Sequence, residues 1–239
     1  MADITVYHAG VAGPATYVEK YLKEYGISIV DYPTPDITHL LLDVPSRDIP
    51  AGLLERLPED ICIVGGNLTS PELEGYRKLD LLQNESYLAR NAAITADCAV
   101  RVAATRMATV FSGLSVLVIG WGRIGKCLAQ LLQRIGCNVT VAVRKDSDRA
   151  ILTALGFRSV KSSVLQNLQS YALIFNTVPA SMLRRSDLSI CPNSLKIDLA
   201  SKPGMDGADV IWARGLPGLY APESSGKLIV ETFLKEVTA

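Results

Sequence analysis

The stretch Ser115-Val116-Leu117-Val118-Ile119-Gly120-Trp121-Gly122-Arg123-Ile124-Gly125 decides the fold of this chain. After Ser115 it begins with a β-branched and Leu run, which is typical of a strand buried on both faces of a parallel sheet. The glycines that follow have Gly-x-Gly-x-x-Gly spacing, and the apolar residues after them recur at helical spacing. A strand, a glycine loop and a helix in this order predict a Rossmann unit that binds a dinucleotide.

The three glycines have separate roles in such a unit. Gly120 makes the tight turn, Gly122 lets the backbone approach a pyrophosphate, and Gly125 lets the helix pack close to the strand. The helix is expected to end at Gly136, before a second strand over 138–143. The alternative is a Rossmann-like layer without a cofactor. We predict that the cofactor pyrophosphate is bound by Gly120, Trp121, Gly122, Arg123, Ile124 and Gly125.

Trp121 is an unusually large residue for this loop. Its indole could crowd the phosphates, or it could pack against the first domain. We expect the second arrangement, because the flanking glycines leave the backbone free to approach the ligand.

The end of the second strand indicates which dinucleotide binds. A NAD site commonly places Asp or Glu there to accept hydrogen bonds from the ribose 2′-hydroxyl, whereas this chain has Arg144 and Lys145. A guanidinium can hold a 2′-phosphate through two hydrogen bonds, and Ser147 is a further candidate donor. We therefore predict NADP(H) over NAD(H), with a solvated basic loop as the alternative.

Composition limits the class of protein. The chain has 239 residues, 49% of them hydrophobic, and 24 basic residues balance 24 acidic ones. This balance, without a dense basic tract, predicts no nucleic-acid and no membrane partner. No stretch has the length of a transmembrane helix, and the start lacks the features of a secretory signal, so a cytoplasmic protein is expected. The five cysteines are scattered among apolar neighbours, and we predict no metal site.

Strands and helices alternate along the rest of the chain, so we predict an α/β protein with two domains. Residues 1–92 are expected to form a smaller flavodoxin-like domain, completed by a C-terminal helix over 222–237. Residues 93–221 are expected to form the Rossmann domain with its doubly wound parallel sheet, entered by a helix over about 95–111. In the first domain the expected strands are 4–7, 27–30, 39–44 and 61–64, and the expected helices are 14–25 and 53–57.

Two further apolar runs, 173–175 and 195–199, predict buried strands of the Rossmann sheet. Their carboxyl ends should face the ligand, as in other open α/β sheets. Lys202 could hold a substrate carboxylate or transfer a proton, although a solvated loop charge is an equal alternative. The cofactor-binding residues expected at these ends are Asn176, Thr177, Val178, Pro179, Ala200 and Ser201.

Several blocks together resemble the A subunit of dipicolinate synthase over about residues 85–235. They are Asn91-Ala92-Ala93-Ile94-Thr95-Ala96-Asp97, the 120–125 loop, Asn176-Thr177-Val178-Pro179, Ile197-Asp198-Leu199-Ala200-Ser201-Lys202-Pro203-Gly204, Gly215-Leu216-Pro217-Gly218 and Ala221-Pro222-Glu223-Ser224-Ser225-Gly226. The chain departs from that family in a shorter first domain, a first loop that begins at His8, and Asp97 where the family commonly has Glu.

The resemblance implies a fold like that of formate and glycerate dehydrogenases. It implies a protein that works with a flavoprotein-like B subunit, oxidising a dihydrodipicolinate-type heterocycle to dipicolinate with transfer of hydride to NADP, in sporulation. A homodimer is expected by fold analogy. On this basis the catalytic candidates are Lys202, Thr95 and Asp97. The candidates for binding the dicarboxylate are Arg90, Asn91, Ser224, Ser225 and His8, and Gly215 and Pro217 join the cofactor-binding set.

The histidines argue against a related class. Ordinary 2-hydroxy acid dehydrogenases of this fold use a His late in the cofactor domain as acid and base, but this chain has only His8 and His39, both in the first domain. His8 has a structural hydrogen-bonding role as its alternative, and His39 is expected to have no chemical role. Two other functions remain open: an NADP-dependent dehydrogenase of another small carboxylated substrate, and a non-catalytic NADP-binding regulatory or scaffold subunit.

Overall fold

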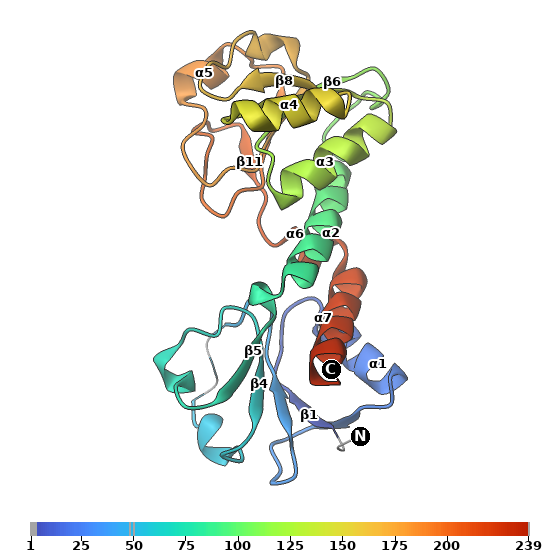
Figure 1. The fold of residues 1–239 in the computed structure, drawn as a ribbon, viewed down its shortest axis with the longest axis vertical. Coiled ribbons are helices and arrows are strands. Elements are labelled where there is room, and N and C mark those ends of the chain that lie inside the picture. The colour runs from blue at the N-terminus through green and yellow to red at the C-terminus, as the bar shows by residue number, and fades with distance from the viewer. Residues whose placement is uncertain (1–3, 48, 50, 239) are drawn as a thin grey trace. The chain divides into compact units, whose positions relative to one another are not determined.

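The computed structural model describes residues 4–47, 49 and 51–238, which form two compact units. Unit 1 comprises Met1–Asn91 and Pro217–Ala239, and unit 2 comprises Ala92–Leu216. Each unit has its own sheet, in which every strand pairing is parallel (Figure 1). The predicted α/β fold with two parallel sheets is therefore confirmed.

The sheet of unit 2 has the strand order β11-β10-β9-β6-β7-β8. This is the doubly wound Rossmann order, and its topological switch point lies between β6 and β9, where Ile119 pairs with Asn176. A ligand crevice is expected there because the crossovers on either side of this point lie on opposite faces of the sheet. The strands are β6 (Ser115–Ile119), β7 (Asn138–Val143), β8 (Arg158–Lys161), β9 (Leu173–Asn176), β10 (Leu195–Asp198) and β11 (Val210–Trp212).

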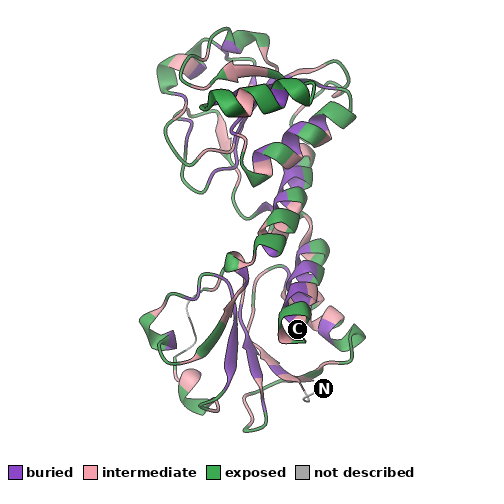
Figure 2. Cartoon of the chain, in the orientation of Figure 1, coloured by how far each residue is buried: buried purple, intermediate pink, exposed green. Residues whose placement is uncertain are grey.

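The helix after β6 packs on this sheet through one apolar face. Leu128, Ala129 and Leu132 of this helix are buried, and Gly136 follows it with φ +89°, a conformation suited to glycine. Figure 2 shows mainly exposed residues along α4 (Asp146–Ala154), in which Leu152 is buried. The helical segments of unit 2 are α3 (Arg123–Arg134), α4 (Asp146–Ala154), η4 (Leu168–Ser170) and α5 (Arg185–Ser189).

The sheet of unit 1 has the order β2-β1-β3-β4-β5, which is the flavodoxin-like order. Helix α7 (Pro222–Val237) packs against α1 (Ala15–Glu24) in this unit. The strands are β1 (Thr5–His8), β2 (Ser28–Val30), β3 (His39–Leu41), β4 (Cys62–Gly65) and β5 (Arg77–Asp80), and the short 3₁₀ turns are η1 (Leu54–Arg56), η2 (Pro71–Leu73) and η3 (Leu81–Gln83).

Two helices, α2 (Glu85–Ala104) and α6 (Leu216–Tyr220), each include residues of both units. The sequence predicted a helix over about 95–111, and this prediction was wrong at both ends. The helix begins early because the side-chain oxygen of Asn84 accepts a hydrogen bond from the backbone N–H of Tyr87 at 2.8 Å, which caps the first turn. The backbone after Ala104 turns instead of continuing as helix.

Strand β5 was not predicted, and its composition explains why. Arg77 and Lys78 are exposed, as suits an edge strand, and the apolar signal is too weak to identify it from sequence. Each unit buries its own apolar cluster, which includes Leu117, Ile119 and Ile174 in unit 2 and Leu40, Ile61 and Ile63 in unit 1. Among the residues that the structure describes, no helix combines the length and apolarity needed to cross a membrane.

Candidate functional site

A cleft of about 410 Å³ lies at the carboxyl ends of β6, β7, β8 and β9 in unit 2. Its size is in the range of small-molecule and cofactor sites. Its position is the switch point of the sheet, where α/β proteins bind dinucleotides. The residues that line it are Gly120, Trp121, Gly122, Ala142, Val143, Arg144, Lys145, Asp148, Ser162, Val178, Ala180 and Met182.

The three glycines of the loop have the geometry that a pyrophosphate cradle requires. Gly120 has φ +106°, and a Cβ there would overlap the side chain of Thr177. A Cβ on Gly125 would overlap the carbonyl oxygen of Gly120, so only glycine allows this close approach of helix and strand. A Cβ on Gly122 would meet no atom within 4 Å, which leaves its backbone open to a ligand.

Helix α3 begins immediately after this open position. Gly122 is its N-cap residue, and no hydrogen bond from a side chain of the described residues caps it. The N–H groups of the first helical turn have no partners within the helix and attract a phosphate. The residues of the loop therefore fit the pyrophosphate of a dinucleotide.

The predicted basic pair directly follows Val143, the last residue of β7, and lies at the cleft. Arg144 and Lys145 are exposed and both line it, whereas Ser147 does not. Ser162, directly after β8, supplies a hydroxyl that the sequence did not indicate. Asp148 also lines the cleft, so one carboxylate lies near the two basic side chains.

Trp121 packs within unit 2. Its ring meets the ring of Phe157 edge-on, with centroids 5.8 Å apart, and Lys126 Nζ lies 5.9 Å from the indole centroid. The sequence predicted neither contact. Phe157 lies between α4 and β8, far from Trp121 in the sequence. The indole is thus held by its own unit while it lines the cleft.

Asn176 and Thr177 support the cleft from behind. Asn176 is fully buried, and its side-chain amide donates to Asp198 Oδ1 at 2.9 Å and to the carbonyl of Val178 at 3.0 Å. Thr177 Oγ1 donates to the carbonyl of Ile119 at 2.9 Å, which ties the end of β9 to that of β6. Of the predicted 176–179 block, the structure places only Val178 in the lining.

The segment after β10 carries Ala200, Ser201 and Lys202. Ala200 is buried, whereas Ser201 and Lys202 are exposed. The carbonyl of Ser201 accepts a hydrogen bond from Arg214, and the carbonyl of Ala200 accepts one from Trp212 Nε1 at 3.0 Å. None of these residues, nor Gly215, lines the cleft, and Pro217 belongs to unit 1.

Lys196 and Asp209 form an ion pair beside this segment that the sequence did not reveal. Lys196 is fully buried in β10, and its Nζ donates to Asp209 Oδ2 at 2.5 Å and to the carbonyl of Ser194 at 3.0 Å. The hydrogen bond from Lys196 holds the pKa of Asp209 below its ordinary value. The pair joins β10 to the connection that precedes β11.

The remaining catalytic candidates lie on α2 in unit 2. Thr95 is buried. The carboxylate of Asp97 forms an ion pair with Arg101 Nε at 2.9 Å, one helical turn further on. Both partners are more than half exposed, so this ion pair leaves Asp97 in contact with solvent.

The substrate-binding candidates lie in unit 1. Arg90 and Asn91 are on α2, and Arg90 forms an ion pair with Glu231 of α7. His8 Nδ1 lies 3.2 Å from Glu19 Oε1, and the His8 side chain is only 3% exposed. Ser224 is exposed and Ser225 is buried, both in the first turn of α7.

Helix α7 is anchored next to those serines. Glu223 Oε1 accepts hydrogen bonds from Lys20 Nζ at 2.8 Å and from the Tyr21 hydroxyl at 3.0 Å. These two donors of α1 hold the pKa of Glu223 below its ordinary value. The acidic residue at the helix start therefore already has protein partners.

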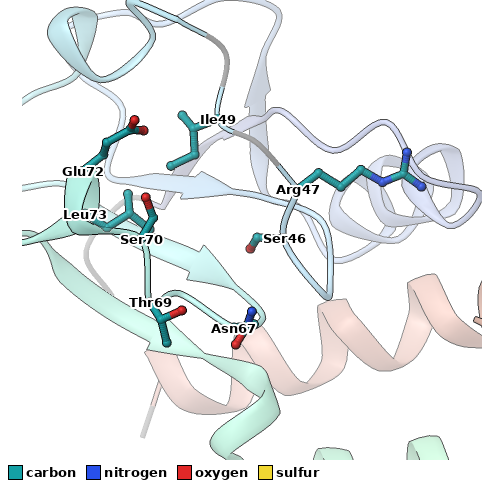
Figure 3. A pocket seen from close by; sticks show the side chains of 8 residues that line it. All are labelled: Ser46, Arg47, Ile49, Asn67, Thr69, Ser70, Glu72 and Leu73. Atoms are coloured by element: carbon teal, nitrogen blue, oxygen red, sulfur yellow. The ribbon is translucent and has the colours of Figure 1, made fainter. Parts of the chain in front are cut away.

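A second cleft, of about 460 Å³, lies in unit 1 beside the loops that follow β3 and β4. Figure 3 shows the Arg47 guanidinium directed away from the other labelled side chains; its Nε lies 3.9 Å from Asp43 Oδ2. Glu72 is the acidic member, and hydroxyl and amide groups make up most of the polar lining, so the cleft suits polar small molecules in general. None of the predicted site residues lines it: its members are Ser46, Arg47, Ile49, Asn67, Thr69, Ser70, Glu72 and Leu73.

The comparisons with known proteins find similarity among solved structures. No family model matches it, and no curated protein matches it in sequence. The dipicolinate synthase A subunit from Bacillus halodurans aligns at 20% identity over 99% of both chains, with a TM-score of 0.80. The A chain of dipicolinate synthase from Bacillus subtilis aligns at 21% identity over 100% of this chain and 97% of that one, with a TM-score of 0.82.

A transhydrogenase from Sinorhizobium meliloti is also similar, at 16% identity over 99% of this chain and 85% of that one, with a TM-score of 0.74. At such identities the similarity establishes a shared fold. The predicted resemblance to the dipicolinate synthase A subunit is confirmed at this level, and it extends over the whole chain. The chain therefore shares the fold of these proteins.

Proposed function

We propose that this chain is an NADP-dependent oxidoreductase like the A subunit of dipicolinate synthase, and that it oxidises a dihydrodipicolinate-type heterocycle to dipicolinate. The observation that carries the proposal is the cleft at the switch point of unit 2, with the open backbone of Gly122 and the basic pair Arg144 and Lys145. The whole-chain fold similarity to two dipicolinate synthase A subunits supports the substrate class.

The preference for NADP(H) rests on the charges around the strand end. Asp146, the nearest carboxylate in sequence, forms ion pairs with Arg149 and Lys161. No ion pair within the described part of the chain engages Arg144 or Lys145, so both cations are available for a 2′-phosphate. Ser162 takes the donor role that was expected of Ser147, because it lines the cleft. Asp148 would accept a hydrogen bond from a ribose hydroxyl.

NADP held at the Gly122 backbone and Arg144 would supply the hydride acceptor, and the substrate ring would lose a hydride and a proton and so become aromatic. The task left to the protein is positioning. Lys202 is exposed at the carboxyl end of β10 and forms no hydrogen bond or ion pair among the described residues, so it is free to hold a substrate carboxylate. By the same resemblance, we propose that the partner is a flavoprotein-like second subunit and that the assembly is homodimeric.

The cofactor assignment is tested with Arg144→Asp. Loss of a charge-assisted contact of about 1.5–3 kcal/mol predicts NADPH binding that is weaker by about 10- to 150-fold. The new carboxylate also repels the 2′-phosphate, which adds to this loss. NADH, which lacks that phosphate, should bind nearly as before. Calorimetric titration of both cofactors measures this difference.

The matched control is Arg158→Asp, which makes the same charge change at an exposed residue outside the cleft. It should leave both affinities unchanged. Equal loss of NADPH and NADH binding in Arg144→Asp would contradict a 2′-phosphate contact. Equal affinity of the unmodified protein for the two cofactors would contradict the NADP preference itself.

The reaction is tested by generating dihydrodipicolinate in situ with its synthase, with and without a candidate second subunit. Formation of NADPH together with dipicolinate absorbance is the expected result. Lys202→Ala should lower this activity while NADPH binding is retained, and Lys78→Ala, an exposed lysine of β5, serves as the control. Cofactor binding with no product under either condition would favour a non-catalytic NADP-binding subunit.

A further inference from the structure

Two segments of unit 2, residues 177–182 after β9 and residues 199–205 after β10, are joined by a buried pair of side chains. Asp198 is fully buried, and its Oδ1 accepts hydrogen bonds from Asn176 Nδ2 at 2.9 Å and from the Ala200 N–H at 3.0 Å. Its Oδ2 accepts from the N–H groups of Gly204 at 2.6 Å and Met205 at 3.0 Å. One carboxylate therefore fixes both ends of the segment that carries Lys202.

Asn176 holds the other segment in the same way. Its amide donates to the carbonyl of Val178 at 3.0 Å as well as to Asp198, and its side-chain oxygen accepts from the Val178 N–H at 3.1 Å. Every polar side-chain atom of Asn176 and Asp198 therefore forms a hydrogen bond with the backbone of one of the two segments. Buried networks in which every group has a partner hold a single geometry.

The backbones of the two segments also touch directly at Gly204. Its carbonyl accepts hydrogen bonds from the N–H groups of Met182 at 2.7 Å and Leu183 at 3.1 Å. A Cβ at Gly204 would overlap the Asn176 amide and would lie 2.8 Å from the carbonyl oxygen of Val178. Only glycine lets the segments approach this closely.

This contact connects the Lys202 segment to the wall of the cofactor cleft. Val178, Ala180 and Met182 line the cleft, whereas no residue of 199–205 does. A cofactor that packs against this wall would therefore act on Val178, which bonds to Asn176, and on Met182, which bonds to Gly204. Asn176 and Gly204 in turn both bond to Asp198. Each step in this chain of contacts is a hydrogen bond or a close packing contact.

We propose that Asp198 is a positioning residue that couples the cofactor cleft to the Lys202 segment, so that cofactor binding and the conformation of residues 199–205 depend on each other. The inference rests on the proposed function, because it takes the cleft to bind NADP(H). It adds that the bound cofactor determines the position of Lys202, the residue that we propose binds the substrate carboxylate.

The two tryptophans of the chain report on the two sides of this coupling. Trp121 lines the cleft. Trp212 does not line it, and its Nε1 donates to the carbonyl of Ala200 in the Lys202 segment at 3.0 Å. The two indole N–H signals in a nitrogen–proton NMR spectrum, assigned with Trp121→Phe and Trp212→Phe, follow each segment separately.

The experiment titrates the full chain with NADPH and follows both indole signals. Both should shift along the titration with the same apparent Kd. Movement of Trp121 alone would overturn the inference and leave the proposed function intact. Absence of any shift, together with no binding by calorimetry, would instead remove the proposed function.

The variant that tests the coupling is Asp198→Asn, which keeps the size of the side chain. Each oxygen of the Asp198 carboxylate accepts hydrogen bonds from two N–H groups. In the variant, the NH2 group of the new amide replaces one of these oxygens and faces two N–H donors, whichever way the amide is oriented. In this variant NADPH should still shift Trp121, with an affinity weaker by about 2- to 30-fold, while Trp212 loses most of its shift. An undiminished Trp212 shift would overturn the proposal.

Asp206→Asn is the matched control, because Asp206 follows the same segment with a side chain 76% exposed. In this variant, the indole signals of Trp121 and Trp212 should respond to NADPH as in the unmodified chain. Should Asp198→Asn fail to fold, Gly204→Ala makes the second test. It keeps the carboxylate but forces the two segments apart, and it should also uncouple Trp212 from Trp121.

Discussion

At the scale of single residues, His39 shows how burial decides the role of a titratable group. Its side chain lies in β3, with Nδ1 2.8 Å from the hydroxyl oxygen of Thr38 and its ring edge-on to Phe233 at 5.2 Å. Burial lowers its pKa, and the charge of Arg77 lowers it further. Burial in the core of unit 1 therefore favours the neutral form of the imidazole.

This lowered pKa predicts a loss of stability in acid. The unfolded chain takes up a proton on His39 near its ordinary pKa of about 6.5, whereas the folded chain resists it. The contribution of His39 is fully present above that value and declines as the pH falls toward the folded pKa. Each unit of the pKa shift is worth about 1.4 kcal/mol. Urea unfolding between about pH 7.5 and 5 measures the effect.

His39→Gln is the control for this measurement, because the carboxylates of the protein also contribute to acid sensitivity. The variant should be less stable at neutral pH but should lose less stability on acidification. A pH dependence identical to that of the unmodified chain would show that the pKa of His39 does not change on folding.

At the scale of elements, the contact of α1 with α7 completes unit 1 from the two ends of the chain. Gly226 lies in α7 where the helices meet, and a Cβ there would lie 2.8 Å from Tyr17 Cβ and 3.0 Å from the Val18 nitrogen. The ion pair of Glu223 with Lys20 lies at the same contact. Glycine weakens a helix interior but is needed here for close approach.

Gly226→Ala should therefore destabilise the protein although alanine favours helices. Overpacking costs about 1–3 kcal/mol and the gain in helix propensity is about 1 kcal/mol, so a net loss of up to about 2 kcal/mol is expected. Chemical denaturation measures it. Gly218→Ala is the control, because the nearest atom to a Cβ at Gly218 is 3.6 Å away. A stabilised Gly226→Ala would contradict the tight contact.

At the scale of the whole molecule, two parallel sheets each bury a separate apolar cluster, and all residues that line the 410 Å³ cleft belong to unit 2. A ligand that binds only the folded state stabilises what it binds by mass action. NADPH at about 100 times its Kd should therefore stabilise unit 2 by about 2.7 kcal/mol.

Hydrogen exchange with and without NADPH measures this distribution. Amides of β6, β7 and β9 should gain protection, while those of β1, β3 and β4 should change little. Arg144→Asp at the same NADPH concentration should show much less protection. Protection confined to unit 1 would contradict the placement of the cofactor in the cleft of unit 2.

The strongest local patterns were predicted well. The strands 115–119 and 138–143 and the C-terminal helix 222–237 have the predicted bounds. Strand β5 was missed because three of its four residues are charged, and α2 was misplaced because its start depends on one capping side chain at Asn84. Ser162, Ala180 and Met182 could not be identified as lining residues, since they follow the ends of two different strands and carry no motif.

The sequence alone determined that unit 2 is a Rossmann layer with a glycine loop, because apolar periodicity and glycine spacing are local properties of the chain. Tertiary structure decided which strand ends meet at the cleft, that Ser162 and not Ser147 lines it, and that Asp198 joins two segments. These facts depend on strand order and on buried hydrogen bonds between residues distant in sequence. Such bonds form only once parallel strands bring their carboxyl ends to one edge.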